Sequence, residues 1–136
     1  MADVSGITAV RVTENTQFET VSYGATISAG QTLYIDTTDN EHKLADADGA
    51  AALQKARGIA ITPGIDAGAG LIARGGSIIL VGATLAVGTA YYLSDTAGGI
   101  KPAADLTTGD NVVLLGVAAT TTQLDLEIRD FQITHA

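Results

Sequence analysis

The chain has 136 residues, of which 46% are hydrophobic and only 4% aromatic, and it carries a formal net charge of −8 at pH 7. This length suits one domain with a core of its own, and the acidic balance disfavours nucleic acid and anionic membrane surfaces as partners. Cysteine is absent, which excludes disulfides and thiolate chemistry. The sequence has neither a basic-then-apolar leader nor an apolar run of membrane-spanning length, so we expect a protein made in a cytosol.

The first segment, residues 1–22, has apolar side chains at irregular intervals. This pattern predicts an extended N-terminal arm with at most one strand, at "TAVRV". An arm of this kind is suited to adding a strand to the exposed sheet edge of a partner. Its apolar side chains are therefore the candidate contacts with a partner: Val4, Ile7, Val10, Val12 and Phe18.

Residues 23–136 predict a single β domain. In "TLYID", Leu33 and Ile35 alternate with polar side chains, as expected for a half-buried strand. The segments "RGIAIT", "GLIARGG" and "SIILV" predict further strands, with a turn at "PGIDAGA". "TAYYLS", the Gly98-Gly99 turn, "NVVLLGVAA" and "QLDLEI" continue the series. Many short strands joined by glycine-rich turns predict an all-β fold, a small β-barrel or β-sandwich of β-tulip or jelly-roll type.

One segment, "DADGAAALQKA" at residues 46–56, favours a helix. Alanine, leucine, glutamine and lysine propagate helices, and Asp46 or Asp48 is placed to cap this one. The sequence therefore predicts one short helix, of about three turns at most.

A 58-residue spacing relates two parts of the chain, residues 25–62 and 83–120. Ten of 38 aligned positions are identical without a gap. In the first segment these are Ala25, Thr26, Gly30, Tyr34, Thr38, Lys43, Ala45, Gly58, Ala60 and Thr62. The pattern indicates two pseudo-repeats, and two similar β-hairpins in one barrel are the simpler interpretation.

Motifs that could carry chemistry are incomplete. "GAGLIA" matches a relaxed dinucleotide fingerprint, but no helix is predicted after it. "DADG" begins like a calcium loop, yet its twelfth position is Arg57 instead of glutamate. Ser77 lacks the flanking glycine of a nucleophile elbow. We therefore predict no catalytic residue, no cofactor and no metal site, and hence no enzyme.

Two other groups of polar residues are expected to be solvated. His42 lies in a predicted polar turn, and His135 lies one residue from the carboxyl end of the sequence. Five acidic residues cluster in one segment and could pair for acid–base chemistry or bind a cation, but a solvated loop face is the preferred interpretation. They are Asp36, Asp39, Glu41, Asp46 and Asp48.

Recurring phrases span most of the chain: the "AGQTLY" entry, the "GIA" strand, and the "GTAYYLSDTAGGI" hairpin before "LLGVA". In these phrases the sequence resembles the small head decoration, or cement, proteins of tailed bacteriophages. The resemblance implies a β-rich homotrimer on the outer surface of the capsid, made in the host cytoplasm, which clamps neighbouring major capsid subunits. A surface-binding module of a phage fibre or spike is the alternative, because such modules use similar hairpins.

Overall fold

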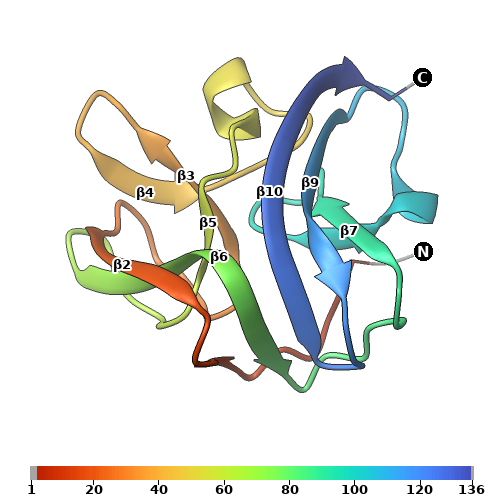
Figure 1. Cartoon of the computed structure of the whole chain (residues 1–136). Helices are drawn as coiled ribbons and strands as arrows, with labels where there is room; N and C mark the ends of the chain where they lie inside the picture. The colour runs from red at the N-terminus through yellow and green to blue at the C-terminus, as the bar shows by residue number, and fades with distance from the viewer. Residues whose placement is uncertain (1–2, 136) are drawn as a thin grey trace.

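The computed structural model describes residues 3–135 and confirms the all-β class (Figure 1). Its strands are β1 (Ala9–Val12), β2 (Gln17–Ser22), β3 (Thr32–Asp36), β4 (Glu41–Leu44), β5 (Gly58–Ala60), β6 (Ala69–Val81), β7 (Ala90–Leu93), β8 (Ile100–Pro102), β9 (Asn111–Ala118) and β10 (Gln123–Thr134). Two 3-10 helices, η1 (Ala51–Gln54) and η2 (Ala103–Asp105), interrupt them. In this described part, no helix is long and apolar enough to cross a membrane.

All strand pairs are antiparallel, and they form one curled sheet in the order β4-β3-β5-β6-β10-β9-β7-β8. The two segments "GLIARGG" and "SIILV", expected as separate strands, are one strand, β6. Residues 69–75 of β6 pair with β2, and residues 76–79 pair with β10. In Figure 1, β6 runs between a group of strands that includes β2 to β5 and a second group that includes β7, β9 and β10. It is therefore the strand that joins the two halves of the molecule.

The two halves have the same strand order. The first half reads β4-β3-β5-β6-β2 and the second reads β8-β7-β9-β10-β6. Along the chain, β6 is therefore the last strand of the first half and the first strand of the second. The registers also agree under the 58-residue spacing: Leu33 pairs with Leu44, and Tyr91 pairs with Pro102. Segments 25–62 and 83–120 thus have equivalent places in the two halves.

Backbone contacts repeat with the same spacing. The N–H of Gly30 donates to the carbonyl of Ala60, and the N–H of Gly88 donates to the carbonyl of Ala118, each over 2.8 Å. In each half, the strand at the end of the sheet, β4 or β8, accepts one further backbone hydrogen bond. His42 in β4 accepts from Gly24, whereas Ile100 in β8 accepts from Val4. The N-terminal segment therefore closes the second half in the way that the residues after β2 close the first.

Each half has its own apolar interior. Ile27, Leu33 and Ile72 are buried in the first half, with Tyr23 and Ala60 beside them. The equivalent side chains in the second half, Leu85, Tyr91 and Leu124 among them, belong to a larger cluster that also includes residues of β5 and β6. A third cluster, made of Tyr34, Ala45, Ala47, Leu93 and Val113, fills the junction between the halves.

Residues 1–22, expected as an arm, contain two strands within the described residues. β1 agrees with the strand expected at "TAVRV", whereas β2 was not expected. Both strands pair with β6 of the same chain. Most side chains of both strands are exposed or only partly buried, so the sequence has little need for a regular alternation of polar and apolar residues.

The helix predicted at residues 46–56 is present only as a much shorter helix. Only residues 51–54 are helical, as the 3-10 turn η1, and its N-cap residue Ala50 makes no side-chain cap bond. Asp46 and Asp48 therefore cap no helix. The preceding backbone bonds to the other half of the molecule instead: the N–H of Ala47 donates to Ser94, and the carbonyl of Ala47 accepts from Asn111. These tertiary bonds and the burial of Ala45 and Ala47 override the helix propensity of the alanines.

Gly76, in the middle of β6, has a positive φ of 73°, and a Cβ added there would lie 1.8 Å from the carbonyl oxygen of Asn15. Gly76→Ala is therefore expected to lower the free energy of unfolding by about 3 kcal/mol or more, as measured by urea denaturation. Gly88→Ala is the control, because Gly88 also has a positive φ, of 80°, but has open space around its added Cβ. It should cost only about 1–2 kcal/mol. Equal losses in the two variants would contradict a steric constraint at Gly76.

Candidate functional site

The five candidate contacts of the N-terminal segment fall into two groups. Val10 is a core residue, and Val4 and Ile7 are partly buried against the same cluster. Val12 and Phe18, in contrast, are 48% and 57% exposed. The structure therefore does not bring the five together on one surface, and of the five only Val12 and Phe18 are exposed to a partner.

The C-terminal half of β10 is a second apolar feature, which the sequence analysis did not identify. β10 pairs with β6 through residues 123–126 only, while its pairing with β9 continues to Thr134. Residues 127–134, here called the β10 edge, thus have no strand partner on one side within the described chain. Phe131 and Ile133 on this edge are 44% and 60% exposed. They are two residues apart, as in a strand, but out of phase with Leu124, Leu126 and Ile128, and the pairing with β9 shifts register in this region.

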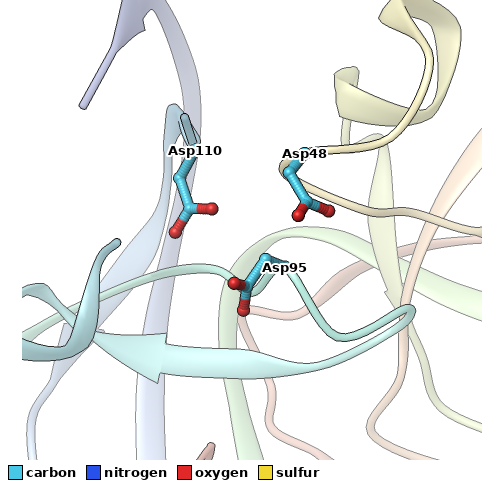
Figure 2. A group of neighbouring side chains, drawn as sticks. All are labelled: Asp48, Asp95 and Asp110. Atoms are coloured by element: carbon cyan, nitrogen blue, oxygen red, sulfur yellow. The ribbon is translucent and has the colours of Figure 1, made fainter. Parts of the chain in front are cut away.

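A charged cluster lies at the junction of the two halves and is defined by Asp48, Asp95, Lys101 and Asp110. The Lys101 ammonium donates to Asp110 Oδ2 over 2.7 Å and lies 3.0 Å from Asp95 Oδ1. The side chains of Lys101 and Asp110 are 3% and 0% exposed. Figure 2 shows the carboxylates of Asp48, Asp95 and Asp110 gathered around a common space.

Loops from both halves position this cluster. Asp48 follows β4, Asp95 lies in the turn between β7 and β8, and Asp110 immediately precedes β9. Thr107 fixes Asp110, because its backbone N–H donates to Asp110 Oδ2 over 3.0 Å, and its hydroxyl donates to Asp95 Oδ2 over 3.1 Å. The backbone N–H and the hydroxyl of Thr107 thus fix the orientation of the Asp110 and Asp95 carboxylates.

The ionisation of the cluster follows from these contacts. Burial alone would lower the pKa of Lys101, but its hydrogen bonds to Asp110 and Asp95 outweigh burial and raise that pKa. The hydrogen bond from Lys101 lowers the pKa of Asp95. Beside the cluster, burial and then the neighbouring Asp48 carboxyl raise the pKa of Asp46. Lys101 is therefore a permanently charged ammonium among an excess of carboxyl groups.

The first half contains an exposed counterpart, in which Lys43 occupies the position of Lys101. Lys43 lies 2.8 Å from Asp36 Oδ2 and 3.0 Å from Asp39 Oδ2, and its side chain is 29% exposed. Hydrogen bonds to Asp36 and Asp39 raise the pKa of Lys43, and the bond from Lys43 lowers the pKa of Asp36. The acidic segment expected as one solvated face is thus divided between the Lys43 pairs and the junction.

His42, expected to be solvated in a polar turn, is 3% exposed in β4. Neither of its ring nitrogens has a hydrogen-bond partner. Burial, followed by the positive charge of Arg57, lowers the pKa of His42. The equivalent residue in the second half is the buried Ile100. His42 therefore fills an apolar position as a neutral imidazole.

The remaining motifs acquire structural roles. "GAGLIA" lies almost entirely within β6, so no helix N-terminus follows it to hold a pyrophosphate. Ser77 is buried and bonded to Asn15 and Thr13. In chemical terms, the charged cluster offers carboxylate oxygens to a cation, and the exposed side chains of β1, β2 and β10 offer apolar contact.

In comparisons with known proteins, no protein-family model matches the chain and no curated protein sequence is significantly similar to it.

Lys101→Met is expected to lower the free energy of unfolding by about 3–5 kcal/mol, because it leaves the buried Asp110 carboxylate without its countercharge. Lys43→Met is the matched control at the equivalent position, where solvent replaces the lost ammonium. It should have a much smaller effect in the same denaturation experiment. A similar loss in both variants would show that burial of the Lys101 pair is not what matters.

The neutral His42 makes stability depend on pH. Its pKa is lower in the folded chain than in the unfolded chain, so its contribution is complete above the unfolded value of about 6.5 and is lost as pH falls through the folded value. His42→Ile, which installs the residue type of position 100, should therefore reduce the loss of stability between about pH 7 and about pH 5. Denaturation at a series of pH values measures this, and parallel curves for the two proteins would contradict it.

Proposed function

We propose that this chain is a structural virion protein that decorates the outer surface of a phage capsid and clamps neighbouring major capsid subunits. The phrases around "AGQTLY", "GTAYYLSDTAGGI" and "LLGVA" support this proposal, and so does an all-β fold of small size. A clamp of this kind needs contact surfaces and a stable framework, and the proposal assigns it no catalytic role.

The observation that carries the proposal is the β10 edge. It combines a row of backbone groups without a strand partner with two exposed apolar side chains, Phe131 and Ile133. An exposed strand edge binds a partner by adding a strand, and apolar side chains beside it supply the anchoring contacts. Large exposed apolar side chains are also typical of interaction sites.

The N-terminal segment has a narrower part in this proposal than its sequence predicts. Because β1 pairs with β6 of the same chain, the backbone groups used in that pairing are not available to a partner. Val12 and Phe18 are the members of the predicted contact set that would touch a capsid subunit or a neighbouring copy.

The proposed assembly is a homotrimer on the capsid, produced in the host cytoplasm. Seven large apolar side chains are exposed in the described chain, which favours contact with further copies and with the major capsid protein. The net charge of −8 disfavours packaged DNA and membranes as partners.

The test uses particles of the encoding virus that lack this protein. A clamp adds contact energy only in the assembled shell, so these particles should release DNA at a lower temperature and still adsorb to the host, and purified protein should restore the release temperature. Normal release with lost adsorption would instead support the fibre or spike module and reject the clamp.

The same add-back experiment tests the surface. Phe131→Ser combined with Ile133→Ser should weaken capsid binding by about tenfold or more, because both exposed anchors are lost. Val87→Ser is the control, since Val87 is an exposed apolar residue in the loop before β7. Light scattering of each purified protein reports whether it is a trimer. Undiminished binding of the double variant would contradict the assignment of the β10 edge.

A further inference from the structure

The charged cluster has the dimensions of a cation site. Asp48, Asp95 and Asp110 each offer one carboxylate oxygen, and these three oxygens lie within 4.8 Å of one another. Oxygens that bind a calcium ion at about 2.4 Å are separated by about 4.8 Å at most, when they lie on opposite sides of the ion. Each pair of these oxygens is therefore close enough to share one Ca²⁺ ion, and small side-chain rotations would bring all three onto it.

An independent observation comes from Asp110. Its side chain is fully buried, and while Oδ2 is bonded to Lys101 and Thr107, Oδ1 has no hydrogen-bond partner among residues 3–135. In Figure 2, the Asp110 carboxylate is directed toward the space that it shares with Asp48 and Asp95. A buried carboxylate oxygen without a partner is costly, and a bound cation would remove that cost.

Lys101 does not satisfy the whole cluster. Its ammonium contacts Oδ1 of Asp95 and Oδ2 of Asp110, while Oδ2 of Asp95 accepts from the Thr107 hydroxyl. One ammonium among the three carboxylates of Asp48, Asp95 and Asp110 leaves an excess of negative charge.

We propose that Asp48, Asp95 and Asp110 bind one Ca²⁺ ion. Oxygen ligands of this hardness suit calcium, and water completes its coordination because Asp48 is exposed. With three carboxylates and a neighbouring ammonium, the expected dissociation constant is about 10⁻⁴ to 10⁻³ M. This inference is independent of the proposed function, since it concerns the junction of the two halves and not the β10 edge.

Such an ion would connect the two halves directly. Asp48 belongs to the loop after β4, whereas Asp95 and Asp110 flank β8 in the second half. Binding to the folded chain, which alone assembles the three ligands, raises its stability by linkage. Calcium should therefore raise the midpoint of thermal unfolding and also give a binding signal in a titration.

The experiment titrates CaCl₂ into the full chain after treatment with EDTA and dialysis, by isothermal calorimetry, and measures the unfolding midpoint with and without about 10 mM CaCl₂. The expected result is one site per chain and a higher midpoint with calcium. MgCl₂ should raise the midpoint less, because magnesium demands a tighter octahedral shell.

Asp48→Asn and Asp110→Asn should each weaken calcium binding by about tenfold or more, since each removes a charged ligand. Asp48 is exposed, so its variant tests the site without disturbing the core even if Asp110→Asn fails to fold. Asp39→Asn is the control, because Asp39 has the equivalent relation to Lys43 on the surface. Absence of binding heat and of a midpoint shift, equal shifts with MgCl₂, or equal weakening in Asp39→Asn would overturn the proposal.

Discussion

The continuity of β6 is the constraint on which the rest of the fold depends. Its first part completes the first half of the molecule and its second part begins the second half, so hydrogen bonds to β2, β5, β10 and β1 all converge on one strand. Gly76 lets the strand pass the turn between β1 and β2 at a backbone separation that no side chain permits. Neither half can therefore be complete without the other.

The same hairpin carries different chemistry in the two halves. Lys43 and Lys101 are equivalent, yet the side chain of Lys43 is 29% exposed whereas that of Lys101 is buried against Asp95 and Asp110. His42 and Ile100 are likewise equivalent, and both are buried. Equivalent backbone positions thus supply the framework, while the loops between strands decide which charges are removed from water.

Local patterns made part of this structure predictable. The alternation in "TLYID" predicted β3 with its observed bounds, and the Gly98-Gly99 turn predicted the hairpin of β7 and β8. The sequence predicts "GLIARGG" and "SIILV" as two strands and not as the single β6, because nothing in it shows that strands on either side span the glycines at 75 and 76. The charged cluster escaped prediction because Asp48, Asp95 and Asp110 are far apart in the chain and meet only through the crossing loop.

The closure of the second half by the N-terminal segment sets an order of events during synthesis. Val4 and β1 leave the ribosome before their partners, which lie in β8 and β6. Until those partners emerge, the apolar Val4, Ile7 and Val10 have no strand to cover them. These residues are thus made well before they can reach their native contacts, and a fold that depends on contacts between distant parts of the chain forms slowly.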